Sequence, residues 1–263
     1  MKRIITFLLM LLCISVFTSC ENEKIEPLQE LKGQELISES DSSDNEYTIK
    51  AYRNNGGATV IGELFYWKEL YIMINYAHRG ASEYAPENTL SSFYLGMIQG
   101  ANGIETDVHR TKDGVLVLFH DDTLDRVSDG VGKISDYTFE ELRKVKIYGN
   151  STIGFYDRIV TLREFLEKFS QYDIRFAIEL KEEGVEEDTL NMINEFGILD
   201  KTTFTSFKYD YISKIKELNS KARVGWLISE VTNETIKKLL DIGGEEIAPK
   251  AENITEELLE KLR

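Results

Sequence analysis

The chain is poor in two kinds of residue, and each scarcity excludes a class of protein. It has only two cysteines, and one of them, Cys13, lies in a segment that we expect to be removed, so the mature chain can form no internal disulfide. Basic residues are also few, 31 Lys and Arg against 46 Asp and Glu, for a net charge of -15. A nucleic-acid surface needs a basic footprint, so nucleic acid is excluded as a partner. An anionic small molecule is not excluded, because a small site can be locally positive on an acidic protein.

Long apolar runs are absent apart from the first residues. Lys2 and Arg3 precede the apolar segment Ile4–Phe17, which is short for a membrane span and typical of an export signal. The next residues, up to Cys20, resemble the lipobox of bacterial lipoproteins, in which the cysteine becomes the lipidated first residue. We therefore predict a signal peptide over residues 1–19 and a lipid on Cys20 that anchors the exported protein to a membrane, at the periplasmic face or the cell surface. The alternative is an ordinary secretory signal in which Cys20 has no role.

The rest of the chain divides by composition into a tether and one domain. Residues 20–46 are acidic, contain several serines and have few aromatic side chains. Such a segment cannot bury enough apolar surface to offset its ordering entropy, so we predict a flexible tether. Residues 47–263 are long enough to bury one sizeable core.

From Tyr71 onward, short apolar runs alternate with amphipathic stretches. The runs predicted as strands are Tyr71–Ala77, Gly103–Val108, Val115–Phe119, Ile174–Leu180, Thr202–Phe207, Val224–Ile228 and Glu246–Pro249. The stretches predicted as helices begin at Pro86 and after Thr161, and cover Thr189–Phe196, Tyr209–Leu218 and Thr232–Leu240. This alternation predicts an α/β fold with a mostly parallel sheet, and seven strands in a row favour a TIM (β/α)8-type barrel.

Rare polar residues stand at the ends of four successive predicted strands. They are His78, Arg79, Glu105, Asp107, His120, Asp121, Glu179 and Lys181. All strands of a parallel barrel end at one rim, so we expect these side chains to converge there. Three neighbouring carboxylates repel one another unless a hard divalent cation lies among them, and oxygen ligands suit Ca²⁺ or Mg²⁺.

This set of residues predicts metal-assisted cleavage of a phosphodiester. The cation, Arg79 and Lys181 would surround a phosphate with positive charge, and two imidazoles would move protons near neutral pH. Simpler interpretations exist for each residue alone, such as an exposed ion pair between Glu179 and Lys181, which stabilises little. We interpret the third histidine, His109, as a loop residue at a strand end without a catalytic role. The joint placement of the set favours the chemical interpretation.

Several motifs resemble the glycerophosphodiester phosphodiesterase family, whose members are TIM barrels. They are AHRGASEYAPENT, GIETDVHRTKDGVLVLFHDDTLDR, VTLREFLEKF, AIELK and TFTSF, spread over Ile74–Pro249. The resemblance implies His78 and His120 as the acid/base pair, Glu105, Asp107 and Glu179 as metal ligands, and Arg79 and Lys181 on the phosphate. It also implies a supporting role for Glu87, which could equally serve the dipole of the helix that follows.

The resemblance also implies an eighth strand, after the helix equivalent to Ile254–Arg263, that this sequence does not contain. We expect a gap between the seventh strand and the first, with a hairpin at Asn54–Gly57 that leaves it open. An open barrel edge exposes apolar surface, so low solubility would follow. The alternative is that the segment Tyr47–Trp67 covers the gap.

The leading functional hypothesis is an exported, lipid-anchored enzyme that hydrolyses glycerophosphodiesters to glycerol 3-phosphate and an alcohol. A second is a binding lipoprotein, catalytically impaired, on the same barrel. A third is a phosphodiesterase of the same type that acts on phospholipid headgroups, because substrate choice lies in loops and pocket walls. The expected partners are a small-molecule substrate and the membrane, with no protein partner predicted.

Overall fold

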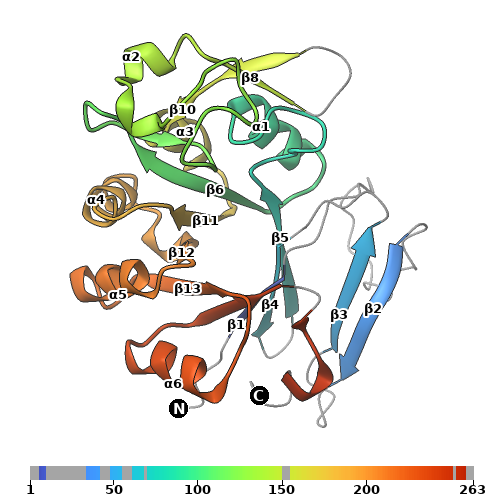
Figure 1. Ribbon diagram of the computed structural model, residues 1–263. Helices are drawn as coiled ribbons and strands as arrows, with labels where there is room; N and C mark the ends of the chain where they lie inside the picture. The colour runs from blue at the N-terminus through green and yellow to red at the C-terminus, as the bar shows by residue number, and fades with distance from the viewer. Residues whose placement is uncertain are drawn as a thin grey trace.

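The computed structural model describes residues 6–9, 34–41, 48–54, 61–67, 70–149, 155–250 and 253–258 (Figure 1). Six strands pair in parallel in chain order. They are β5 (Leu70–His78), β6 (Gly103–Arg110), β11 (Arg175–Leu180), β12 (Thr202–Ser206), β13 (Arg223–Ile228) and β14 (Glu246–Pro249). They correspond to six of the seven predicted strands. The prediction of a TIM-type α/β fold is confirmed, because the carboxyl ends of these strands form one rim.

The remaining predicted strand has a different role from the one expected. It is β7 (Leu116–Leu118), which runs antiparallel to β6 and pairs on its other side with β10 (Val160–Thr161). The expectation that it would be a parallel barrel strand is wrong. Only five residues, Thr111–Val115, connect it to β6, and a parallel crossover needs a dozen or more. The chain therefore folds back on itself beside β6.

Two strands from the first part of the chain lie between the seventh predicted strand and the first. β4 (Ile61–Trp67) pairs with β5, and β1 (Thr6–Leu9) pairs with both β4 and β14. The pairings thus run in a circuit from β5 through β14 and back to β5. In the uncleaved chain the expected open gap is therefore filled, with β1 next to β14. β4 belongs to the segment Tyr47–Trp67, which we considered as the alternative that fills the gap. It pairs with β5 but not with β14, because β1 lies between β4 and β14.

The first part of the chain contains one further pair of strands. β2 (Gln34–Asp41) and β3 (Thr48–Asn54) form an antiparallel pair of their own. β2 lies within the predicted tether, and β1 lies within the predicted signal peptide, whose cleavage would remove it from between β14 and β4. The other residues of the predicted Asn54–Gly57 hairpin turn lie outside the described residues. No helix among the described residues is long and apolar enough to cross a membrane.

The helices follow the strands, and α4 to α6 succeed one another along one side of the sheet in Figure 1. They are α1 (Leu90–Ile98), α2 (Phe139–Leu142), α3 (Leu162–Phe169), α4 (Glu186–Glu195), α5 (Tyr209–Leu218) and α6 (Asn233–Asp241). The shorter elements are η1 (Ile134–Asp136), β8 (Lys146–Tyr148), β9 (Tyr156–Arg158) and η2 (Leu199–Lys201). Thr161 caps α3 as predicted, with Glu164 completing a capping box.

The start of α1 differs from the prediction. The helix begins at Leu90, capped by Thr89, and not at Pro86. Asn88 has a φ of 55°, a left-handed conformation that cannot continue a right-handed helix. Residues 86–89 are thereby free to form the loop that carries Glu87 and Asn88 to the rim. Behind that loop, Phe93 of α1 packs edge-on against Phe165 of α3, with ring centroids 4.8 Å apart, and anchors the loop to the core.

Candidate active site

Three buried carboxylates lie together at the carboxyl ends of two neighbouring strands. Glu105 and Asp107 are two apart on β6 and so point to one side of the sheet, and Asp107 stands opposite Glu179 of β11 in the strand register. One oxygen of each carboxylate lies within 4.8 Å of one oxygen of the other two. The structure therefore brings together the three residues predicted as metal ligands.

Two predicted phosphate-binding residues accompany the carboxylates. Lys181, just after β11, places Nζ 2.9 Å from Glu179 Oε1 and 3.4 Å from Asp107 Oδ1. Arg79, just after β5, places Nε 3.6 Å from Asp107 Oδ2. Each cation is mostly buried and keeps some solvent contact, 13% for the Lys181 side chain and 18% for that of Arg79. Two cations thus face three carboxylates.

The backbone after β5 is bent to serve this cluster. Arg79 has a φ of 57°, unusual for a residue with a side chain, and its amide N–H donates to both the carbonyl oxygen and Oε2 of Glu105, at 3.1 and 3.0 Å. Gly80 follows with a φ of 77°, and a Cβ there would lie 2.4 Å from Ser92 Oγ. Glycine is therefore required at this turn.

The charges of the carboxylates are unequal because of their neighbours. Burial, followed by the negative charge of Asp107, raises the pKa of Glu179 to about 8 and raises that of Glu105 well above its usual value. Burial also opposes ionisation of Asp107, but the cations of Lys181 and Arg79 outweigh it and lower the pKa of that carboxyl. The same carboxylates hold the pKa of Lys181 above its usual value against the effect of burial.

These observations fit a divalent cation. Oxygens that bind Ca²⁺ lie at about 2.3–2.6 Å from the ion, so two of them can be at most about 5 Å apart, which accommodates the observed separation. Asp107 Oδ1 is buried and accepts no hydrogen bond from any described residue. Carboxylates that resist ionisation when left together would ionise around a cation.

One predicted catalytic histidine, His78, ends β5 directly beside the cluster. It stands opposite Glu105 in the strand register, and its Nε2 lies 3.8 Å from Glu105 Oε2. Burial, and next the Arg79 cation, lowers the pKa of His78 to about 3. The imidazole is therefore neutral near pH 7 and can accept a proton.

The second predicted catalytic histidine reaches the site by the β6–β7 hairpin. The amide of Phe119 donates to the carbonyl of Asp107 at 3.0 Å, so His120, the next residue, returns to the level of the carboxylates. Its Nδ1 lies 2.5 Å from Asp121 Oδ1. Burial lowers the pKa of His120, and the cations of Arg79 and Lys181 act in the same direction. An ionised Asp121 accepts the proton of Nδ1, which leaves Nε2 as the unprotonated nitrogen.

Two residues around the site, Asn88 and Arg126, were missed by the sequence analysis, which named Asp121 only as a polar residue at a strand end. Asn88 donates from Nδ2 to Asp107 Oδ2 at 2.8 Å and accepts from Thr106 Oγ1 at 2.7 Å. Asp121 holds His120, and Arg126 binds both Asp121 and Glu87. Asn88 and Arg126 lie in motifs given above, but nothing in their local pattern distinguished them from capping or surface residues.

The other two residues singled out in the sequence are also placed. Glu87 lies 3.4 Å from Arg79 and contacts Arg126, and Thr89, not Glu87, caps α1. His109 is a buried strand residue of β6 and not a loop residue, with Nε2 3.4 Å from the carbonyl oxygen of His120. Cys20, the predicted lipidation site, lies outside the described residues.

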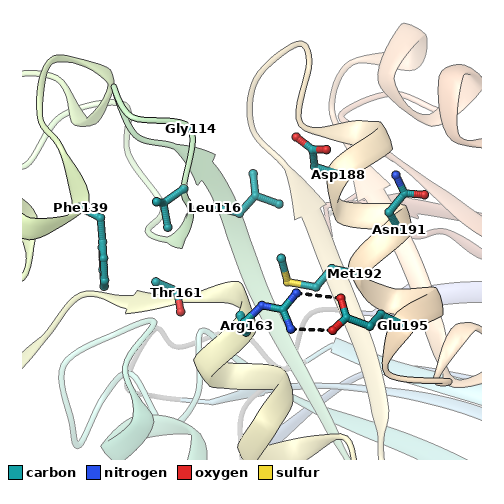
Figure 2. A pocket seen from close by; sticks show the side chains of 10 residues that line it. Gly114, Leu116, Phe139, Thr161, Arg163, Asp188, Asn191, Met192 and Glu195 are labelled. Atoms are coloured by element: carbon teal, nitrogen blue, oxygen red, sulfur yellow. Dashed lines mark hydrogen bonds and ion pairs between the residues drawn. The ribbon is translucent and has the colours of Figure 1, made fainter.

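A pocket of about 480 Å³ lies apart from these residues. The loop between β6 and β7 lines it together with β7, α3 and α4, and an ion pair between Arg163 and Glu195 spans part of it (Figure 2). None of the predicted site residues contributes to this pocket. The carboxylate cluster, in contrast, lies where the barrel fold places catalytic groups. Fold and cluster together define a TIM-barrel enzyme with an acidic site at the rim.

Comparison with known proteins identifies the family. Residues 78–263 match the Glycerophosphoryl diester phosphodiesterase family, and residues 1–73 match a Family of unknown function (DUF5412). A glycerophosphodiester phosphodiesterase of Caldanaerobacter subterraneus is 34% identical over 192 residues, 70% of this chain and 78% of the relative. One from Bacillus altitudinis is 32% identical over 200 residues, 71% of this chain and 80% of the relative.

A solved structure agrees with these relatives. An Oleispira antarctica phosphodiesterase in complex with the product sn-glycerol-3-phosphate is 30% identical, with a TM-score of 0.63 over 71% of this chain and 78% of that chain. The chain belongs to the glycerophosphoryl diester phosphodiesterase family, and the prediction of an enzyme of this kind is confirmed.

Proposed function

We propose that the protein hydrolyses glycerophosphodiesters to glycerol 3-phosphate and an alcohol, with one divalent cation and two histidines. The observation that carries the proposal is the buried cluster of Glu105, Asp107 and Glu179, with oxygens within 4.8 Å of one another and flanked by Arg79, Lys181 and His78. The Oleispira protein, solved with sn-glycerol-3-phosphate, supports the choice of substrate class.

Glu105, Asp107 and Glu179 would hold the cation, and of the two expected cations Ca²⁺, with its longer bonds, suits the spacing of their oxygens better. When bound, the cation supplies positive charge that stabilises the negative charge developing on the phosphoryl oxygens. Arg79 and Lys181 add fixed positive charge at the same rim and orient the phosphate. An anionic phosphodiester thus enters a locally positive site on an acidic protein.

The two imidazoles carry the protons. One accepts a proton from water as the water oxygen bonds to phosphorus, and the other donates a proton to the alcohol oxygen as its bond to phosphorus breaks. Asp121 keeps the Nδ1 proton of His120 in place and so directs Nε2 toward the reaction. A phosphate anion between the histidines would offset the cations that lower their pKa values.

The test measures glycerol 3-phosphate released from glycerophosphocholine. We expect activity with Ca²⁺ or Mg²⁺ and none in EDTA, and a loss of about a hundredfold or more in His78→Ala or His120→Ala. Full activity in EDTA would contradict the role of the cation. Product release by both variants at the unmodified rate would contradict the role of the histidines. Release from intact phospholipid alone would favour the headgroup phosphodiesterase instead.

We further propose export and membrane anchoring through a lipid on Cys20, on the evidence of the basic start, the apolar segment and the lipobox-like sequence before the cysteine. A single acyl chain gives only reversible membrane binding, so stable anchoring needs more than one. Labelling with a radioactive fatty acid in bacterial cells tests this proposal. Cys20→Ala should abolish the label, and an unchanged label would contradict the assignment.

A further inference from the structure

Arg126 lies outside the predicted set of catalytic residues, yet it contacts both sides of the site. Its Nε donates to Asp121 Oδ2 at 2.5 Å, and its Nη1 and Nη2 donate to the two oxygens of Glu87 at 3.0 and 2.6 Å. Every nitrogen of the guanidinium is thus used by a carboxylate. The two carboxylates belong to loops that are far apart in the sequence.

Each of the two carboxylates continues to a residue of the proposed reaction. Glu87 Oε1 lies 3.4 Å from Nη1 of Arg79, in the loop that follows β5. Asp121 Oδ1 lies 2.5 Å from Nδ1 of His120, in the loop that follows β7. A continuous chain of charged contacts therefore runs from Arg79 through Glu87, Arg126 and Asp121 to His120.

We propose that Arg126 is a positioning residue that fixes His120 relative to Arg79 by cross-linking the two loops through Asp121 and Glu87. The proposal rests on the proposed function, since it assigns Arg126 to the orientation of that acid/base histidine. Among the described residues, Arg126 contacts neither the carboxylate cluster nor His78, so its effect on the reaction passes through Asp121 and Glu87.

The chemistry of arginine suits this role better than that of lysine. A guanidinium presents a planar fork of donors that can engage one carboxylate with two nitrogens and a second with its Nε, whereas an ammonium is a point charge. The hydrogen bond to Glu87 is the main cause that raises the pKa of Arg126. Burial opposes ionisation of Asp121, but hydrogen bonds from Arg126 and His120 outweigh it and lower its pKa, so Asp121 is an anion near pH 7.

The chain offers a matched control for a mutation of Arg126. Arg163 donates to both oxygens of Glu195 from two nitrogens, each at 2.7 Å. It lines the pocket shown in Figure 2, which lies apart from the carboxylate cluster. The side chains of Arg126 and Arg163 are equally exposed, 46% each. Removal of either breaks a similar ion pair, and only Arg126 connects to His120.

The first measurement separates kcat from KM for glycerophosphocholine hydrolysis. We expect Arg126→Gln to lower kcat about ten- to a hundredfold, with KM changed by less than about threefold, because a small misplacement of a catalytic group costs rate. The kcat of Arg126→Lys should lie between those of Arg126→Gln and the unmodified enzyme, since lysine keeps the charge but loses the planar set of donors. Arg163→Gln should match the unmodified enzyme. A rise of KM at constant kcat would overturn the proposal, because Arg126 would then bind substrate directly.

The second measurement does not need activity. In ¹⁵N-histidine-labelled protein, nitrogen NMR should show His120 protonated at Nδ1, with the signal identified by its loss in His120→Ala. We expect Arg126→Gln, and not Arg163→Gln, to move part of the population to the Nε2-protonated form. An unchanged His120 signal would overturn the proposal even in an active enzyme. If glycerophosphocholine is not hydrolysed, the proposed function fails, and this measurement alone still decides the role of Arg126.

Discussion

The two ends of the parallel strands both carry buried carboxylates, but the charges around them are balanced differently. At the amino-terminal end, Glu246 is fully buried, and its Oε1 accepts from Arg223 Nη2 at 2.7 Å and from Thr203 Oγ1 at 2.9 Å. Gly225 makes room for it, since a Cβ there would lie 3.2 Å from Glu246 Cβ. Among the described residues, this carboxylate thus faces the Arg223 guanidinium.

At the carboxyl-terminal end, three carboxylates share two cations, and two of the three have raised pKa values. Such an arrangement costs folding free energy when no metal ion is bound, because the carboxylates are desolvated and the two basic side chains do not fully compensate their charge. The difference separates a carboxylate that stabilises the fold from carboxylates that are kept for a ligand. This division agrees with the general rule that the carboxyl-terminal face of such a barrel is functional and the opposite face is structural.

The largest effect is expected from Glu105→Gln at the functional end. Loss of a residue that only hydrogen-bonds a metal ligand typically lowers activity about ten- to hundredfold. Glu105 is itself a proposed metal ligand, so its replacement should lower phosphodiesterase activity by more than that. The fold should survive, because a glutamine Oε1 can still accept from the Arg79 amide. Steady-state kinetics with saturating Ca²⁺ and thermal unfolding in EDTA measure the two quantities.

The sign of the change in stability is also fixed. The pKa of Glu105 is raised in the folded protein, so its favourable contribution is present at low pH and is lost as pH rises from the unfolded value toward the folded one. At pH 7 the residue therefore destabilises the metal-free fold, and Glu105→Gln should leave Tm unchanged or raise it. A clear fall in Tm would show that Glu105 is structural, and the comparison of the two ends would fail.

Glu246→Gln at the structural end should give the opposite result. Loss of the charge weakens the hydrogen bond from Arg223 to Glu246, and the free energy of unfolding should fall by about 2 kcal/mol, as is typical for a hydrogen bond to a charged group. Activity below the melting temperature should stay within about twofold. Urea unfolding followed by fluorescence measures the stability. A large loss of kcat in a folded variant would contradict the structural role.

The sequence predicted the site better than it predicted the connections around it. Glu105, Asp107, Glu179 and Lys181 could be placed at one rim, because period-two spacing and parallel strands leave little choice of side. His120 was expected at the same rim, but for a wrong reason, because the strand before it was predicted to be parallel to β6 and is antiparallel. The five-residue link Thr111–Val115 was the available signal that β7 must be antiparallel.

Other features had no signal in the local sequence. Asn88 contacts Thr106 and Asp107, 18 and 19 residues away, and Arg126 connects Asp121, five residues away, to Glu87, 39 residues away, so these contacts depend on the tertiary fold. The pairing of β4 and β1 between β14 and β5 joins the two ends of the chain. This pairing depends on which edges of the sheet are left unpaired by the other strands, and the periodicity of neither segment specifies its partner.

The smallest expected effect is a release of protons when the cation binds. Burial and the charge of Asp107 raise the pKa of Glu179 to about 8, so in the metal-free protein at pH 7 this carboxyl is largely protonated. Ligand carboxylates must be ionised, so binding of Ca²⁺ should displace protons, and the apparent affinity should rise from about pH 6 to about pH 8 and level off above. Titration calorimetry at pH 7 in Tris and in PIPES should give different heats, because the two buffers differ in enthalpy of protonation and neither binds Ca²⁺ strongly. Glu246→Gln should show the same difference as the unmodified protein, while Glu105→Gln should show a smaller one. Equal heats in both buffers would mean that the carboxylates are already ionised without the cation, and the two ends of the barrel would then be alike in charge balance.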